Sequence, residues 1–339
     1  MSESKKHILV IRLSAMGDVA MTVPVLRSLT KQHPDLNITV LTRAFFAPFF
    51  RDIPNVNVAI AEVDTKHKGV FGLYKLAKGL NKNKFYVIAD LHNVLRTKIL
   101  KKFLRCKRFI TIDKGRKEKQ ALTAGKIFKP LKTTHQRYAD VFKALGYPID
   151  LSNPSFPDKA VLNENLQELI GDKVEKLIGI APFAAHEGKM YPLELMKIVI
   201  ERLSKNYKVI LFGGGEKEEA ILYDLQGAYK NVVSIAGKLT LEEEMDIISN
   251  LDSMVSMDSG NAHIAAMLGI KTITIWGVTH PYAGFAPFNQ PEDYALLADR
   301  NQFPKIPTSV YGNKYPEHYK EAAGSVSPEN IIAKIKSVI

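Results

Sequence analysis

An aspartate in a loop of small residues near the start of the chain is the first candidate for chemistry. Asp18 closes the stretch "SAMGD", which follows the apolar run "HILVI" and precedes "VAMTVP". A lone carboxylate at the tip of a strand can act as a general base that takes one proton. Aspartate is also a favoured helix N-cap, so Asp18 has a structural interpretation as the cap of a helix beginning at Val19.

A second loop with chemical potential lies in "SMVSMDSGNAHIAAMLG" near the other end of the chain. Asp258, Ser259 and Gly260 form a predicted tight turn between a buried strand and a helix, where free backbone N–H groups and the helix dipole favour a phosphate. Gly260 allows a ligand to approach the backbone, and His263 follows one turn later. The structural alternative makes Asp258 an N-cap and His263 a core histidine.

Two further loops carry residues suited to a nucleotide diphosphate. "GIAPFAAHEGKMYP" brings Lys189 to the end of a predicted strand, and "LFGGGEKEEA" combines Gly213 and Gly214 with Glu216 or Glu218, either of which can bind a ribose. The glycine turn lacks the Rossmann spacing G-x-G-x-x-G and is a weak signal by itself. It also lacks G-x-x-x-x-G-K-[ST], which argues against a P-loop ATPase. Together the three loops predict a nucleotide-diphosphate site.

No metal site is predicted. The nine histidines are scattered without an H-x-x-x-H pair, and no Asp-x-Asp follows a predicted strand to hold a divalent cation on a diphosphate. The expected stabilisation of a leaving diphosphate therefore comes from the helix dipole, backbone N–H groups and Lys189.

The elements that position these loops alternate between strand and helix along the whole chain. This alternation predicts an α/β fold with parallel sheets covered by helices. The proline-containing stretch "IDLSNPSFPDKA" is the expected linker, giving a first domain over 1–152 and a second over 153–325. A last helix over 326–339 is expected to pack back on the first domain. Two such halves predict a ligand cleft between them.

Composition and charge limit the classes of protein. The chain has 339 residues, a single cysteine and no apolar run near the ~20 residues of a membrane span. These features favour a reducing, cytoplasmic setting. The net charge of +12 is concentrated in residues 96–132, which hold 14 Lys/Arg against 2 Asp/Glu. Such a block indicates an anionic partner (a membrane surface, an acidic substrate or RNA) or else a solvated helix face and loop. No RNA-binding aromatic motif accompanies it, so nucleic acid is not expected.

Three stretches carry a resemblance to a known family. "ILVIRLSAMGDVAMTVPVL", "KMYP" and "SMDSGNAHIAAMLGIKTITIWGVTHP" resemble the ADP-heptose:lipopolysaccharide heptosyltransferases of glycosyltransferase family 9. The resemblance implies a GT-B fold of two Rossmann-like domains facing a central cleft. It also implies an inverting, metal-independent transfer of heptose or a related sugar, without a cofactor. The acceptor domain is the first and the nucleotide-sugar domain the second.

The same resemblance implies roles for residues. Asp18 is the general base that deprotonates the acceptor hydroxyl, and one base is what a single displacement needs. The donor phosphates meet Lys189, and Leu239 lies where the family packs an apolar side chain near the adenine. The remaining donor contacts implied are Asp258, Ser259, Gly260 and His263.

The acceptor is expected to be an anionic lipopolysaccharide core. His92, Arg96 and Lys98, which follow the strand "FYVIADL", are candidates to hold it, while Ser14 and Gly17 leave clearance for a sugar. The basic block 96–132 is expected to contact the membrane, which makes the protein peripheral on the inner face of the inner membrane.

This sequence also departs from the family. Ala184 and Ala185 replace paired hydroxyl residues before Lys189, and Lys217 stands about where an acidic ribose contact is expected. Two alternatives therefore stay open. One is a GT-B enzyme with another nucleotide-sugar donor, or an epimerase. The other is a basic membrane- or RNA-binding module with a degenerate sugar-nucleotide fold.

Overall fold

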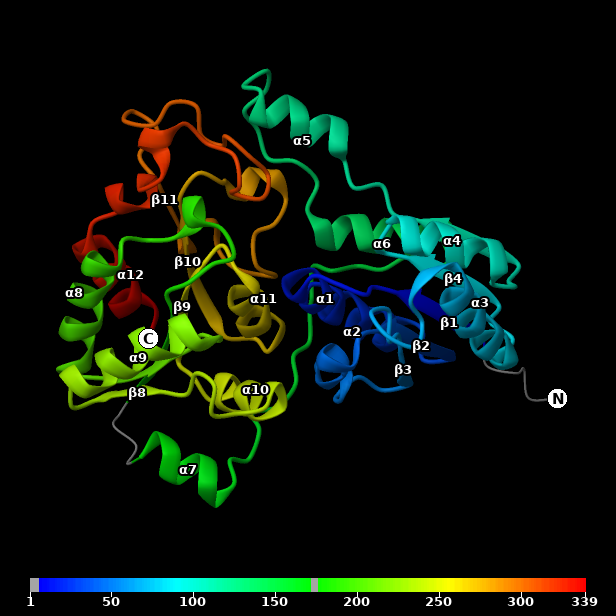
Figure 1. Cartoon of the computed structure of the whole chain (residues 1–339), viewed down its shortest axis with the longest axis horizontal. Coiled ribbons are helices and arrows are strands. Elements are labelled where there is room, and N and C mark those ends of the chain that lie inside the picture. Colours follow the sequence, from blue (N-terminus) through cyan, green and yellow to red (C-terminus); the bar gives the residue numbers. More distant parts are fainter. Residues whose placement is uncertain (1–5, 172–175) are drawn as a thin grey trace. The chain divides into compact units, whose positions relative to one another are not determined.

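A computed structural model describes residues 6–171 and 176–339 and divides the chain into two compact units (Figure 1). The first unit runs to Gly115 and resumes over Lys132–Phe156. The second comprises Arg116–Leu131 and Pro157–Ile339. No helix among the described residues is long and apolar enough to cross a membrane.

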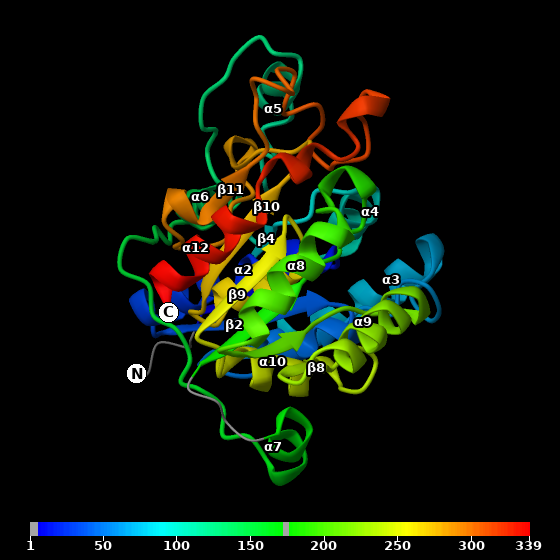
Figure 2. The same cartoon turned by 90° about the vertical axis from the view of Figure 1, so that its left-hand side faces the viewer.

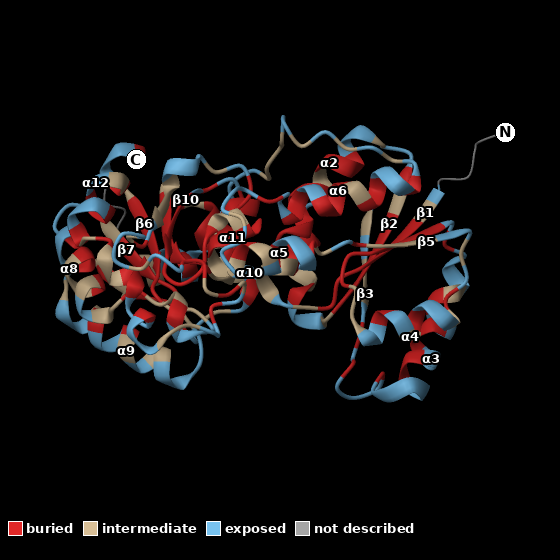
Figure 3. Cartoon of the chain, turned by 90° about the horizontal axis from the view of Figure 1, so that it is seen from above, coloured by how far each residue is buried: buried red, intermediate tan, exposed pale blue. Residues whose placement is uncertain are grey.

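The first unit is built on a five-stranded parallel sheet in the order β3-β2-β1-β4-β5. Its strands are β1 (Lys6–Ile11), β2 (Leu36–Thr42), β3 (Val56–Ile60), β4 (Val87–Asp90) and β5 (Arg108–Thr111). Its helices are α1 (Met16–Ala20), α2 (Thr22–Gln32), α3 (Gly69–Leu80), α4 (Leu95–Phe103) and α6 (Thr134–Leu145), with a 3-10 segment over Ala44–Phe50. Helices α3 and α4 cover one face of the sheet, and α2 and α6 cover the other (Figure 3).

The second unit is built on a six-stranded parallel sheet in the order β11-β10-β9-β6-β7-β8. Its strands are β6 (Leu177–Ala181), β7 (Lys208–Leu211), β8 (Val232–Ser234), β9 (Ser253–Met257), β10 (Lys271–Trp276) and β11 (Ala295–Leu297). Its helices are α5 (Arg116–Thr123), α7 (Glu164–Ile170), α8 (Leu193–Ser204), α9 (Glu216–Ala228), α10 (Leu241–Ser249), α11 (Gly260–Met267) and α12 (Pro328–Val338), seen from a second side in Figure 2.

The sheets form because their strands are short apolar runs rich in β-branched residues. Residues 8–11 of β1 and 254–257 of β9 are fully buried, as expected for central strands covered on both faces. Helices α3 and α8 bury one apolar stripe each and keep charged residues outside. The predicted α/β class with two Rossmann-like units is confirmed.

The boundaries differ from those expected from the sequence. The first unit extends to Phe156, and residues 116–131 belong to the second unit, because Leu122 and Leu131 pack against Ala283 there. The last helix also belongs to the second unit and not to the first. In α12, Ile331 and Ile335 are fully buried in the core that α8 and the second sheet build.

Two local details also correct the expectation. The helix carrying Asp18 begins at Met16, not at Val19, so Asp18 lies in its first turn and not at its N-cap. Helix α7 is absent from the sequence-based prediction. The sequence does contain a signal for this helix, because Asn163 before it is a favoured N-cap residue. In the structure the Asn163 side chain accepts a hydrogen bond from the N–H of Leu166 and caps the helix.

Candidate functional site

In each sheet the strand order, followed along the chain, changes direction at one point between two neighbouring strands. Predicted site residues follow these two strands in the sequence. In the first unit the reversal lies between β1 and β4, which are succeeded by Asp18 and His92. In the second it lies between β6 and β9, which are succeeded by Lys189 and Asp258. In open α/β sheets ligands bind outside the carboxyl ends of the strands at such switch points.

The Asp18 carboxylate is held at one oxygen. Its Oδ2 lies 2.6 Å from Nη2 of Arg12 and accepts a long hydrogen bond, 3.4 Å, from the N–H of Ala15. Its Oδ1 accepts no hydrogen bond from the described residues, and 30% of the side chain is exposed. The arrangement leaves one carboxylate oxygen available to a ligand.

Arg12 is the residue that fixes Asp18, and the sequence interpretation missed it. The guanidinium is buried, donates through Nη1 to the carbonyl of Leu91 at 2.6 Å, and lies over the ring of Tyr138. Tyr138 in turn donates its hydroxyl to the carbonyl of Asp18 at 3.1 Å. A charged residue directly after a buried strand was the available signal, because a buried cation needs a partner.

His92 lies beside this pair. Its Nε2 is 3.5 Å from Oγ of Ser14, and its buried Nδ1 has no hydrogen-bond partner among the described residues. Burial, then the positive charges of Arg12 and Lys114, lower the pKa of His92 to about 3. The imidazole is therefore neutral near pH 7 and can act as a hydrogen-bonding group rather than a cation.

The loop that carries His92 is fixed by a buried carboxylate. Asp90 accepts hydrogen bonds from the N–H groups of His92 and Asn93, both at 3.0 Å, and from Oγ1 of Thr97 at 2.9 Å. Because Asp90 is 1% exposed and occupied on both oxygens, it serves the structure of the loop.

The other predicted acceptor residues are less closely joined to this group. Ser14 and Gly17 flank the turn into α1, next to Asp18. Arg96 is half exposed on α4, 3.8 Å from the carboxylate of Asp64, and its charge contributes to the lowered pKa of His92. Lys98 is exposed on α4, and no contact joins it to Asp18 or His92 in the described part of the chain.

In the second unit, Lys189 and Asp258 form a buried ion pair across the switch point. Lys189 Nζ lies 2.7 Å from Oδ2 of Asp258, and the two side chains are 15% and 7% exposed. Thr279, after β10, donates its hydroxyl to the same oxygen at 2.9 Å. Gly312 packs against the lysine stem, where a Cβ would lie 2.6 Å from Cγ of Lys189. A lysine has three donors, so Lys189 can hold Asp258 and still bind an anion.

The start of α11 follows directly. Ser259 is its N-cap residue, but the hydroxyl makes no cap hydrogen bond to the helix and instead lies 2.9 Å from Oγ of Ser256. Asp258 is therefore not the N-cap that the structural alternative required. The N–H groups of the first turn at Gly260 have no side-chain cap, and His263 is buried one turn later.

The glycine turn after β7 is occupied by its own helix. The N–H of Gly214 donates to Glu218 and that of Gly215 to Glu219, each at 3.0 Å. Gly213 is tightly enclosed, since a Cβ there would lie 2.8 Å from Leu222. Glu216 is exposed, and its carboxylate forms no hydrogen bond or ion pair with the described residues. Of the two candidate ribose contacts, Glu216 is thus the one whose carboxylate is free.

All predicted donor residues lie on one edge of the second sheet. Lys189 follows β6, Gly213 follows β7, Leu239 follows β8 and Asp258 follows β9, and these four strands are neighbours. Leu239 is partly exposed just before Thr240, which caps α10. The structure therefore gathers residues that span seventy positions in the sequence.

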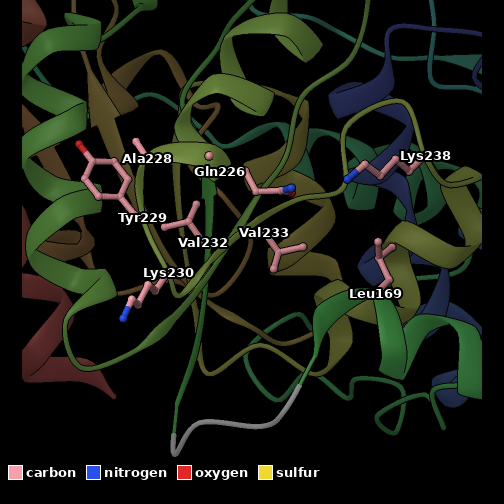
Figure 4. A pocket seen from close by; sticks show the side chains of 9 residues that line it. Leu169, Gln226, Ala228, Tyr229, Lys230, Val232, Val233 and Lys238 are labelled. Carbon is pink, nitrogen blue, oxygen red and sulfur yellow. The ribbon is translucent and has the colours of Figure 1, made fainter.

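A cavity of about 450 Å³ lies elsewhere, at the β8 edge of the second sheet (Figure 4). Its lining includes Leu169, Gln226, Tyr229 and Lys230, and none of the predicted donor residues contributes to it. Among residues 6–171 and 176–339, no group of three or more His, Cys, Asp or Glu side chains is placed to hold a metal ion.

Comparison with known proteins identifies relatives of this architecture. The family model for glycosyltransferase family 9 (heptosyltransferase) matches residues 73–313. Lipopolysaccharide heptosyltransferase 1 of Campylobacter coli is 25% identical over 295 residues, which cover 81% of this chain and 85% of that protein.

Solved structures share the fold. A glycosyltransferase family 9 protein from Veillonella parvula superposes with a TM-score of 0.77 at 19% identity, covering 100% of this chain and 98% of the other. The Escherichia coli heptosyltransferase WaaC with ADP superposes with a TM-score of 0.70 at 18% identity, covering 98% of this chain and 100% of the other.

Proposed function

The chain belongs to glycosyltransferase family 9, the heptosyltransferases, and from this premise we propose that it transfers heptose from an ADP-activated donor to a lipopolysaccharide core acceptor. Lipopolysaccharide heptosyltransferase activity is supported by the curated relatives, and the chain is a glycosyltransferase. The details that follow, an inverting and metal-independent displacement with Asp18 as base, are part of the proposal.

The observation that carries the proposal is the Lys189–Asp258 pair at the switch point of the second sheet, beside the uncapped start of α11. An ammonium group and a helix N-terminus together suit a diphosphate. Asp258 is proposed to orient Lys189, which it holds through Oδ2 together with Thr279, and not to contact the phosphates, because a carboxylate repels them. Ser259, Gly260 and His263 complete the donor contacts.

The glycine turn is assigned to the nucleoside part of the donor. Its N–H groups are already used by Glu218 and Glu219, which makes the turn a poor phosphate site as it stands. The exposed Glu216 is proposed to bind the ribose hydroxyls, with Leu239 against the base. Gly214, where a Cβ would meet no atom within 4 Å, leaves room for the donor to approach the backbone, whereas Gly213 is enclosed by Leu222.

The transfer itself is proposed to run as one displacement. The acceptor hydroxyl gives its proton to Oδ1 of Asp18 while its oxygen attacks the anomeric carbon of the heptose. The bond between that carbon and the diphosphate oxygen breaks, and ADP leaves with its charge stabilised by Lys189 and the α11 N–H groups. Because attack comes from the opposite side, the anomeric configuration inverts.

The acceptor is proposed to bind the first unit. Ser14 and Gly17 border the space at Asp18, and His92, Arg96 and Lys98 supply donors for an anionic sugar. We also propose a cytoplasmic location at the inner face of the inner membrane. Of the basic block 96–132, the proposed membrane contact is the part before Gly115, since residues 116–131 belong to the second unit.

Calorimetric titration with ADP-, UDP- and GDP-sugars tests the donor site. ADP-heptose should bind, and Lys189→Met should weaken its binding at least about tenfold, the equivalent of about 1.4 kcal/mol. Lys205→Met, at the exposed C-cap of α8 and paired with Glu201, should change nothing. If none of the nucleotide sugars binds, the proposal fails.

A further inference from the structure

The surface formed by α3 and α4 carries an unusually one-sided charge. Residues 66–108, from the approach to α3 to the start of β5, hold 13 Lys/Arg and a single acid, Asp90. All thirteen cations are exposed, whereas Asp90 is buried and engaged by its own loop. The basic residues of the block between Arg116 and Lys129, by contrast, belong to the second unit. The basic block 96–132 is therefore not one surface, and the first unit has a cationic face that begins thirty residues earlier.

The same face exposes large apolar side chains. Val70, Phe71 and Tyr74 of α3 are 53%, 86% and 49% exposed, and Leu95 at the start of α4 is 73% exposed. They are not poorly buried core residues, because Leu73, Leu76 and Leu80 already supply the inner stripe of α3. An exposed apolar cluster surrounded by polar residues marks an interaction surface.

The two helices form one continuous face. The rings of Tyr74 and Phe103 pack edge to face with centroids 5.4 Å apart, which joins α3 to α4. The ribbons of the two helices lie next to each other in Figure 3. Along α3, residues 71, 74, 75 and 78 share one outer stripe by helical spacing, so that Phe71 and Tyr74 are followed by Lys75 and Lys78. Apolar groups thus lie at the N-terminal end of the face and cations behind them.

The apolar end of this face lies toward the candidate site of the first unit. Helix α3 follows β3 and α4 follows β4, and the strands are parallel, so both helices begin at the carboxyl edge of the sheet. Asp18 and His92 lie at the same edge, after β1 and β4.

We propose that the α3–α4 face docks on an anionic lipid bilayer, with Phe71 and Leu95 inserted at the level of the headgroups. The lysines of both helices then contact anionic headgroups, and the apolar side chains anchor the protein in a way that charge alone does not. The inference rests on the proposed function in one respect, that the acceptor is anchored in that membrane. Docking by this face brings the carboxyl edge of the sheet, with Asp18, close to the lipid surface.

Co-sedimentation of the full chain with vesicles tests the proposal. The protein should bind vesicles that contain phosphatidylglycerol, bind pure phosphatidylcholine vesicles much more weakly, and be released by added salt. Phe71→Ser with Leu95→Ser should weaken binding at least about tenfold, and Phe71→Trp should retain it. Lys75→Gln with Lys101→Gln should weaken it and reduce its salt dependence. The matched control is Tyr223→Ser with Val161→Ser, two exposed apolar residues of the second unit.

Three results would overturn the inference. The first is equal binding to neutral and anionic vesicles, and the second is unchanged vesicle binding by the Phe71 and Leu95 variants. The third is that these variants no longer form a protein dimer while their vesicle binding stays the same. Release of ADP with a deacylated core acceptor separates this inference from the proposed function. The Phe71 and Leu95 variants should release ADP as the unaltered protein does. If the proposed function is wrong instead, neither the unaltered protein nor the variants release ADP.

Discussion

At the scale of single residues, the Asp18 site depends on Arg12. Its planar guanidinium holds Asp18 Oδ2 with one nitrogen and the carbonyl of Leu91 with the other, so it fixes the carboxylate relative to the strand β4. Lysine cannot make both contacts in that geometry. Arg12 is thus a positioning residue for the proposed base.

Arg12→Lys should lower kcat at least about tenfold, because one charge-assisted hydrogen bond of the pair is lost while the charge is kept. The Kd for the donor should stay the same, since the donor is assigned to the second unit. Arg27→Lys is a suitable control, as that partly buried arginine donates to the carbonyl of Asp52 and to no proposed site residue. An Arg12→Lys enzyme with unaltered kcat would show that the two contacts of the Arg12 guanidinium, to Asp18 and to Leu91, are not needed for catalysis.

His92 predicts a dependence of stability on pH. Its pKa is about 3 in the folded protein and about 6.5 when unfolded, so between these values the unfolded chain binds the extra proton. The contribution of neutral His92 to the free energy of unfolding is complete above pH 6.5 and is lost as the pH falls toward 3. At pH 5 the loss is about 2 kcal/mol.

Thermal unfolding of the His92→Asn protein between pH 4 and 8 tests this point. The variant should lose part of the acid sensitivity of the unaltered protein, whereas His186→Asn, at an exposed position, should keep it all. Identical pH profiles for all three proteins would contradict the buried, neutral state of His92.

At the scale of elements, the segment 116–131 is the least expected feature. It leaves the first unit after Gly115, packs on the second, and returns at Lys132. Lys119 Nζ lies 3.8 Å from the centroid of the Phe285 ring, and Phe128 packs between His280 and Arg300. His280 directly follows Thr279, which donates to Asp258, so this segment supports the loop behind the proposed donor site.

Leu122→Ala should loosen this segment. Leu122 is 1% exposed, and truncation of a buried leucine costs about 2–5 kcal/mol of packing. Residues 116–131 contain several lysines, so trypsin should cleave there sooner in the variant, while the main thermal transition of the second unit changes little. Val161→Ala, at a fully exposed site, serves as the control. Equal cleavage rates would show that the segment is held by other contacts.

Elements and sites differ in how far the sequence predicts them. The strands and most helices follow from apolar periodicity, and Gly146 and Ser327 end or begin helices as their types indicate. The packing of 116–131 does not follow, because a basic loop with one short helix gives no sign of which unit buries Leu122. The pairing of Lys189 with Asp258 does not follow from the sequence either, since it requires that β6 and β9, which are far apart in the chain, be neighbours in the sheet.

At the scale of the whole molecule, the two units repeat one arrangement with opposite chemistry. The first places a carboxylate with one open oxygen at the switch point of its sheet, and the second places a lysine and a helix N-terminus at the switch point of its own. A base and a site for a leaving diphosphate are the two parts that a glycosyl displacement requires. This division of labour is the central claim of the proposed function.

The most direct test is the Asp18→Asn protein, assayed in parallel for ADP-heptose affinity and for turnover. Asparagine can still accept the Arg12 hydrogen bond, but it cannot take a proton from the acceptor hydroxyl. Turnover should fall about 10²–10⁴-fold while the donor Kd stays nearly the same, and Asp35→Asn, an exposed acid of the same unit, should behave as the unaltered protein. Turnover that survives in Asp18→Asn, or donor binding lost along with it, would contradict the assignment of Asp18 as the base.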